Sequence, residues 1–137
     1  MGDECIFCKI VSGEIPAKKI FENEATFAFL DINPSAKGHS LVIPKNHHAT
    51  MLDIPEAELK DVISTVQKVG AAIMKATNAD GFNVLQNNRE AAGQVIPHLH
   101  FHVIPRTIGD SLKLSFGSQK AEEEELKEYE KRVKEQL

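Results

Sequence analysis

The most regular pattern in the chain is Pro97-His98-Leu99-His100-Phe101-His102-Val103-Ile104-Pro105, which holds three of its six histidines. Successive side chains of an extended strand point to opposite faces of a sheet. The pattern therefore predicts a strand with the three histidines on one face and the apolar residues between them on the other. A helix is disfavoured, because at about 100° per residue it would spread the imidazoles around half of its circumference.

This alternation indicates a functional site, because serine or threonine would serve equally well on a solvated face. One metal ion held by all three histidines is disfavoured by distance, since the outer two Cα atoms would lie roughly 13 Å apart at ~3.3 Å per residue. At most two of the imidazoles then share a metal. At least one remains for acid, base or nucleophilic chemistry.

The composition is that of a globular protein, with 137 residues, 42% of them hydrophobic and 26% charged. This length predicts one domain over residues 1–137. A net charge of −4 makes a nucleic-acid partner unexpected. The chain has no apolar run of the ~20 residues that span a bilayer and no signal-peptide pattern, so we expect a cytoplasmic protein with no membrane partner.

A pair of cysteines, Cys5 and Cys8, stands near the N-terminus. Two intervening residues is a spacing with which one turn presents two thiolates to a zinc ion. A redox pair is a second interpretation, although Gly13 and Pro16 leave room for only a short helix where thioredoxin-like motifs open a long one. Two buried, inert thiols are the third. The spacing alone leaves all three open.

Alternating and helical patterns predict the other elements. Strands are expected over 19–21, 25–31 and 82–87, with another between His39 and the His47-His48 pair. One long helix is expected from about residue 55 to 77, with Asp53 and Glu56 as a capping pair and Asn78 and Gly81 at its end. A second, thin amphipathic helix is expected over 121–137. The long helix has an apolar stripe that we assign to the core: Leu59, Val62, Ile63, Val66, Val69, Ile73 and Met74.

Two polar segments are candidates for ligand binding. Asp31 ends a predicted strand, where it can cap a turn or accept hydrogen bonds from ribose hydroxyls. The loop 87–94 precedes the histidines, and its glycine and N–H groups can form an anion cradle in which Asn87 and Gln94 donate to phosphate oxygens. A plain surface turn is the other interpretation of this loop.

These residues resemble the histidine triad (HIT) family, whose motif His-x-His-x-His-x-x matches residues 98–104 without a mismatch. Two other segments, 41–45 and 92–94, also resemble the family, and the likeness covers about residues 4–106. It implies an α+β fold with a five-stranded antiparallel sheet and one long helix, followed here by a helical tail at about 118–137. It also implies a homodimer whose sheets join edge to edge.

Members of the family hydrolyse or transfer nucleoside monophosphates, and the resemblance implies a role for each matching residue. His100 would be the nucleophile that forms a nucleotidyl-histidine intermediate, with no metal required for that step. His102 would contact the phosphate, and His39 and His98 would belong to the surrounding hydrogen-bond shell. The implied nucleotide-binding residues are Asp31, Ile32, Asn87, Gly93, Gln94 and Val95, besides His100 and His102.

A subset of the family has a structural zinc ion, and the resemblance implies Cys5, Cys8, His47 and His98 as its ligands here. The expected substrate is a purine nucleotide in phosphoramidate or phosphoanhydride linkage, with adenosine as the expected nucleoside. Val95 stands where eukaryotic Hint-like members carry a serine. A nucleotide-binding module with little turnover and a zinc-dependent catalyst with the histidines as ligands are the alternative functions.

Overall fold

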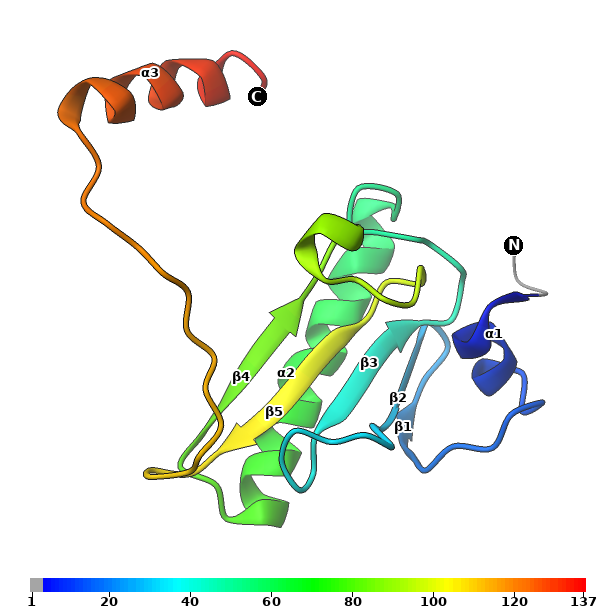
Figure 1. Ribbon diagram of the computed structural model, residues 1–137. Helices are drawn as coiled ribbons and strands as arrows, with labels where there is room; N and C mark the ends of the chain where they lie inside the picture. Colours follow the sequence, from blue (N-terminus) through cyan, green and yellow to red (C-terminus); the bar gives the residue numbers. More distant parts are fainter. Residues whose placement is uncertain (1–3) are drawn as a thin grey trace.

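The computed structural model describes residues 4–137 and contains one five-stranded sheet, with all neighbouring strands antiparallel (Figure 1). The spatial order of the strands is β1-β2-β3-β5-β4. This confirms the α+β fold and the antiparallel sheet expected from the sequence. The strands are β1 Lys19–Glu22, β2 Thr26–Leu30, β3 Ser40–Pro44, β4 Gly81–Gln86 and β5 Phe101–Arg106.

The central strands β2 and β3 are buried on both faces, which explains their nearly continuous apolar sequences. On one face, Ala28 and Val42 pack against the long helix α2 (Glu56–Thr77). On the other face, Phe29 and Leu41 pack against the short helix α1 (Ile6–Val11). The sheet therefore separates two apolar clusters, and α1 covers the side opposite to α2.

Helix α2 lies along the sheet as the periodicity predicts, with Val62, Val66, Val69 and Ile73 buried. Ile63 is an error in the predicted stripe, because its side chain is 46% exposed. The buried stripe of α2 is narrow, so Ile63 lies outside it and faces solvent although it is three positions from the buried Val66.

The predicted ends of α2 are partly wrong. Pro55 is the N-cap and no side chain caps the helix, while Asp53 accepts hydrogen bonds from the N–H and hydroxyl of Thr50. At the other end Asn78 takes a left-handed conformation with φ 54°, as a C-capping residue does. Gly81 does not belong to the helix end but opens β4.

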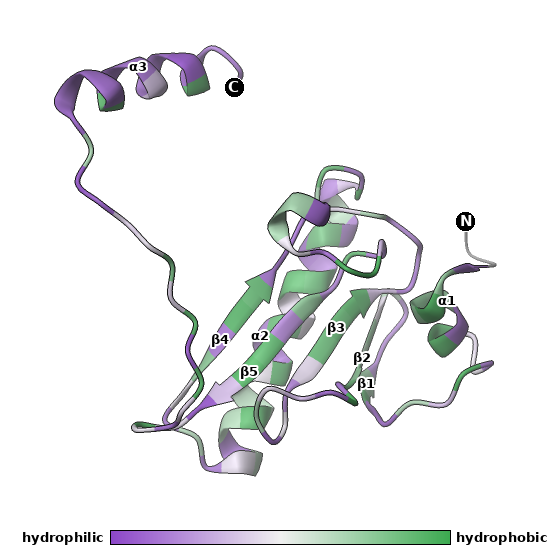
Figure 2. Ribbon diagram, viewed as in Figure 1, coloured by the Kyte–Doolittle hydropathy of each residue, from purple (hydrophilic) through white to green (hydrophobic). Residues whose placement is uncertain are grey.

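The C-terminal segment leaves the sheet after β5 and carries helix α3 (Glu123–Lys134) away from it (Figure 1). Its sequence is mostly hydrophilic in Figure 2. The apolar residues Leu126, Tyr129 and Val133 are all more than half exposed. The predicted helix is therefore present, shorter at both ends than 121–137. Over residues 4–137, no helix is long and apolar enough to cross a membrane.

Candidate functional site

A cavity of about 520 Å³ opens on the α1 side of the sheet. Its walls are mainly apolar, and its polar groups gather where Asp31, His100 and His102 meet. A mainly apolar pocket with a few convergent polar groups is the usual form of a small-ligand site. The apolar lining comes from α1, the end of β2 and two loops: Ile6, Phe7, Ile10, Phe29, Leu30, Ile32, Leu41, Val95 and Ile96.

The histidine stretch differs from the predicted continuous strand. Strand β5 begins only at Phe101, so His98 and His100 lie in the irregular segment before it. This segment is held by turns and loops, since the Leu99 N–H donates to the carbonyl oxygen of His48 at 2.7 Å. His100 and His102 line the cavity, but His98 is fully buried beside the cysteines. The predicted strand is therefore wrong for residues 98–100, but the predicted side is right: Phe7 of α1 contacts the rings of His98 and His100, while Leu99, Phe101 and Val103 belong to the cluster on the α2 side.

The main chain fixes the tautomer of His100. Its Nδ1 atom lies 2.7 Å from the carbonyl oxygen of His98, which can only accept a hydrogen bond. Nδ1 therefore carries the proton, and Nε2 keeps its lone pair. The ring is 9% exposed and belongs to the cavity lining. A neutral imidazole held in this way has one nucleophilic nitrogen.

A second chain of hydrogen bonds fixes the tautomer of His102. The backbone N–H of Ser35 donates to Nδ1 of His39 at 3.0 Å, so His39 carries its proton on Nε2. That Nε2–H donates to Nδ1 of His102 at 2.9 Å. His102 is consequently protonated on Nε2, which makes this nitrogen a donor. A donor next to a nucleophile suits an anionic oxygen.

Asp31 lies beside this chain, with Oδ2 3.5 Å from Nε2 of His39. By distance alone Asp31, His39 and His102 could hold a cation. However, a metal would need the lone pair of His39 Nε2, and the Ser35 N–H leaves a proton on that atom. We therefore assign the three residues to a hydrogen-bond network. The other Asp31 oxygen accepts from the Asn33 N–H at 2.8 Å, as in an Asx turn.

Burial keeps the site histidines neutral. It lowers the pKa of His102 to about 4, with the nearby His100 and His39 rings adding to the shift. It also lowers the pKa of His100 and of His39 below the ordinary value, against the opposing effect of Asp31. An activity that depends on neutral His100 should therefore persist to lower pH than an unperturbed imidazole allows.

The loop before the histidines is braced by Gln94. Its side-chain nitrogen donates to the carbonyl oxygens of Ala49 and Ile96, and its oxygen accepts from the N–H of Arg89. Both side-chain hydrogens of Gln94 are thus used inside the protein, contrary to the predicted donation to phosphate. Gly93 and the 87% exposed Val95 line the cavity.

Asn87 is adjacent to this part of the loop. A Cβ atom built on Gly93 would lie 3.5 Å from its Nδ2. Ile32, also 87% exposed, lies on the cavity rim next to Asp31.

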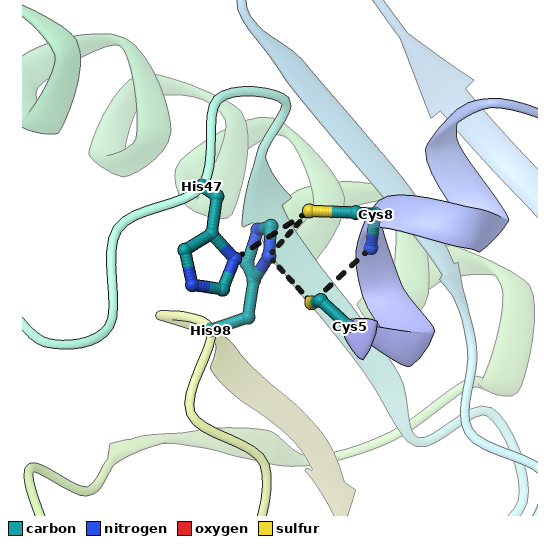
Figure 3. A group of neighbouring side chains, drawn as sticks. All are labelled: Cys5, Cys8, His47 and His98. Carbon is teal, nitrogen blue, oxygen red and sulfur yellow. Dashed lines mark hydrogen bonds between the residues drawn. The ribbon is translucent and has the colours of Figure 1, made fainter. Parts of the chain in front are cut away.

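Four potential metal ligands meet where α1 approaches the histidine segment (Figure 3). The Nδ1 atom of His98 lies 3.3 Å from Sγ of Cys5 and 3.6 Å from Sγ of Cys8. The Nδ1 atom of His47 lies 3.5 Å from Sγ of Cys8. All four ligand atoms lie within 4.8 Å of one another, so these residues could hold a metal ion. His48 does not take part and contacts Glu58 instead.

The donor set fits a closed tetrahedral site. Metal–ligand bonds of ~2.0–2.3 Å place the ligand atoms of a tetrahedron roughly 3.3–3.8 Å apart. The Nε2–H of His98 donates to the carbonyl oxygen of Pro44 at 2.9 Å, so Nδ1 presents its lone pair to the sulfurs. Burial and the neighbouring Cys5 thiol raise the pKa of Cys8 to about 11, so a bound cation displaces a proton here.

Three contributors to the site were not predicted: Phe7, the N–H of Ser35 and the carbonyl oxygen of Pro44. Phe7 lies against the rings of His98 and His100. The apolar spacing of Phe7, Ile10 and Val11 indicates a helix face but not what it covers. Backbone donors and acceptors leave no trace in a sequence, so no pattern could have revealed the other two.

Comparison with known proteins agrees with this geometry. The family model described as HIT domain matches residues 12–108. An adenosine 5′-monophosphoramidase of Candida albicans is 46% identical over 106 residues, which are 74% of this chain and 70% of that protein.

Two solved structures are also similar. A HIT family protein of Bacillus subtilis has a TM-score of 0.91 at 38% identity, over 97% of this chain and 96% of that one. A zinc-bound histidine triad family protein of Mycobacterium smegmatis has a TM-score of 0.79 at 38% identity, over 87% of this chain and 86% of that one.

Proposed function

Because the chain belongs to the HIT family, with its HIT domain over residues 12–108, we propose that it is a nucleotide hydrolase or transferase. It releases a nucleoside 5′-monophosphate from phosphoramidate or phosphoanhydride substrates, and we expect adenosine to be the preferred nucleoside. The observation that carries this proposal is the hydrogen bond from His100 Nδ1 to the His98 carbonyl, which leaves a nucleophilic Nε2 on a ring that lines the cavity. The monophosphoramidase activity of a 46% identical relative supports the substrate class.

The reaction has two balanced steps. His100 Nε2 bonds to phosphorus while the bond from phosphorus to the leaving nitrogen or oxygen breaks, and the leaving group takes up a proton from solvent. A water molecule then attacks phosphorus and releases a proton to solvent, the bond to Nε2 breaks, and the nucleoside monophosphate leaves. His102, with its proton on Nε2, donates to a phosphoryl oxygen in both steps and stabilises the charge there.

The nucleoside occupies the apolar part of the cavity. Asp31 accepts hydrogen bonds from the ribose hydroxyls, and Ile32 packs beside the base. Gly93 allows the phosphate to approach the loop closely, because it has φ 95° and no side chain. Asn87, next to Gly93, contributes a side-chain donor to the phosphate.

The metal at Cys5, Cys8, His47 and His98 is a structural zinc ion, because two thiolates and two imidazoles satisfy its four positions. When bound, zinc would cross-link the chain and would take no part in the reaction. A zinc-bound relative of 38% identity supports this assignment.

The biological unit is a homodimer. Strand β4 is at the sheet edge, and its side chains Phe82 and Val84 are 39% and 46% exposed. An isologous pairing of two β4 edges would extend the sheet and cover these side chains. A cytoplasmic location and the lack of a nucleic-acid partner stay predictions from the sequence.

The test is to trap the intermediate. The protein is mixed with an adenosine phosphoramidate, quenched within one turnover and analysed by denaturing mass spectrometry. An added mass equal to adenylate, absent in His100→Ala, is expected. Turnover by His100→Ala at the wild-type rate would overturn the proposal. AMP binding without turnover on phosphoramidates, dinucleoside polyphosphates and nucleotide sugars would favour a binding module instead.

A further inference from the structure

Phe7 stands between the two cysteine ligands on α1 and touches the histidine proposed as nucleophile. Its side chain is 4% exposed. The ring centroids of Phe7 and His100 lie 5.2 Å apart with planes at 84°, an edge-to-face arrangement. Phe7 meets the ring of His98 in the same way at 5.8 Å. One aromatic side chain thus joins a candidate metal ligand to the site of chemistry.

Helix α1 is too short to hold its own position. It has six residues, and isolated helices of that length are marginal in water. Its position depends on the apolar cluster around Phe7 and on Cys5 and Cys8, which face His98 and His47. A metal bound by these four residues would tie α1 to the loop after β3 and to the segment before β5.

Two links lead from the metal ligands to the His100 ring. The first is the main chain, since the carbonyl of His98 accepts from His100 Nδ1. The second is the edge-to-face contact with Phe7, which limits rotation of the ring. Phe7 also lines the cavity, together with Ile6 and Ile10 on the same helix. A displacement of α1 would therefore alter the cavity wall and release one side of the nucleophile.

We propose that Phe7 is a positioning residue that couples metal occupancy at Cys5, Cys8, His47 and His98 to the orientation of His100 and to nucleotide affinity. This inference rests on the proposed function for the identity of the nucleotide. The effect of the metal on the His100 ring is independent of the proposed function. Metal binding fixes the position of α1. Phe7 then fixes the orientation of the His100 ring and the position of the cavity wall.

The experiment compares wild type with Phe7→Leu, each freed of metal by a chelator and then loaded with zinc. The matched control is Phe27→Leu, because Phe27 is 6% exposed in the same apolar cluster and contacts Phe29. If Phe7→Leu does not fold, Phe7→Met replaces it. Each variant is compared with itself with and without zinc. Any change in AMP affinity caused by direct contact of residue 7 with the nucleotide is present in both states and cancels.

Two readouts are measured, AMP affinity by calorimetry and the imidazole nitrogen signals of His100 by NMR. In wild type and Phe27→Leu, zinc should tighten AMP binding by about tenfold and shift the His100 signals. Phe7→Leu should bind zinc with the same stoichiometry, yet gain less than about threefold in AMP affinity and show at most half of the His100 shift. A full zinc effect in Phe7→Leu would overturn the inference, as would no zinc effect in wild type.

The readouts keep this inference distinct from the proposed function. If no variant forms an adenylate adduct, the proposed function fails, while the NMR comparison still decides whether Phe7 couples metal to ring. If the adduct forms equally fast with and without zinc in wild type, and the His100 signals do not move, the coupling fails and the proposed function stands.

Discussion

The Nε2 atom of His39 lies 2.9 Å from the Nδ1 atom of His102, and this contact determines which nitrogen of His102 carries a proton. Since the Ser35 N–H donates to the other side of His39, the proton of His39 points to His102. The buried His39, just before β3, therefore orients the proton of His102 on the neighbouring strand β5. His39 positions His102 and need not touch the substrate.

The first prediction concerns this relay, the hydrogen-bond chain from the Ser35 N–H through His39 to His102. In His39→Leu, Nδ1 of His102 loses its donor, so the ring can exchange tautomers and no longer presents a constant donor to the phosphate. We expect adenylate transfer to His100 to slow by about 10- to 100-fold, measured in single turnovers with an adenosine phosphoramidate. AMP affinity should change by less than about threefold.

The control for this relay is Ser40→Ala, which removes a neighbouring buried hydroxyl that donates to the Gly38 carbonyl. It should leave the transfer rate within about twofold of wild type. A His39→Leu protein with a wild-type rate, or with His102 still in one tautomer by nitrogen NMR, would contradict the relay.

The second prediction is a pH dependence of stability. Burial lowers the pKa of His102 from 6.5 to about 4 in the folded chain, so the unfolded chain binds more protons between these values. The free energy of unfolding should therefore fall as the pH is lowered from about 6.5 to about 4, and be insensitive to His102 above pH 7.5. One proton sets an upper limit of about 1.4 kcal/mol per pH unit.

The variant that checks this is His102→Asn, whose side-chain oxygen can still accept from His39. Urea unfolding at several pH values should give a shallower slope for His102→Asn below pH ~6.5 than for wild type. Equal slopes for the two proteins would show that His102 is not held neutral by the fold.

Sequence patterns predicted the elements of this fold better than the hydrogen-bond partners of the side chains in the site. Alternation and helical periodicity are local, so the five strands and α2 appear within a few residues of their expected positions. The strand was predicted to begin too early, because the segment before Phe101 is held by the hydrogen bond from the Leu99 N–H to the His48 carbonyl. The role of Gln94 was also missed, since its carbonyl partners are main-chain atoms.

The meeting of distant residues was predicted only through resemblance. Cys5 and His98 are 93 positions apart, and their 3.3 Å contact depends on how α1 returns over the sheet. No spacing rule connects them. The same holds for Phe7, whose apolar character indicates burial but not that it would contact the ring of His100.

The third prediction concerns the metal. Removing zinc should lower the free energy of unfolding by about 3–5 kcal/mol, because a metal that binds only the folded chain stabilises it by mass action. His47→Gln should abolish most of this response in a chelator titration followed by thermal unfolding. The matched control is His48→Gln, which changes the next residue and its contact with Glu58 but leaves the four ligands intact. An equal response in both variants would exclude His47 as a ligand.

The fourth prediction tests strain in the loop before the histidines. Arg89 has φ 74° and ψ 163°, a region that residues other than glycine rarely adopt. The loop holds it there, because its N–H donates to the Gln94 side chain and its carbonyl accepts from the N–H groups of Ala92 and Gln94. Arg89→Gly should therefore raise the free energy of unfolding by about 0.5–1.5 kcal/mol, despite the extra entropy that glycine gives the unfolded chain.

The control separates backbone strain from the loss of the guanidinium. Arg89→Ala removes the same charge but keeps a Cβ atom in the same conformation, so its stability should stay within about 0.5 kcal/mol of wild type. Both variants are compared by urea unfolding at neutral pH. If Arg89→Gly is less stable than Arg89→Ala, the positive-φ conformation of Arg89 does not destabilise the folded chain.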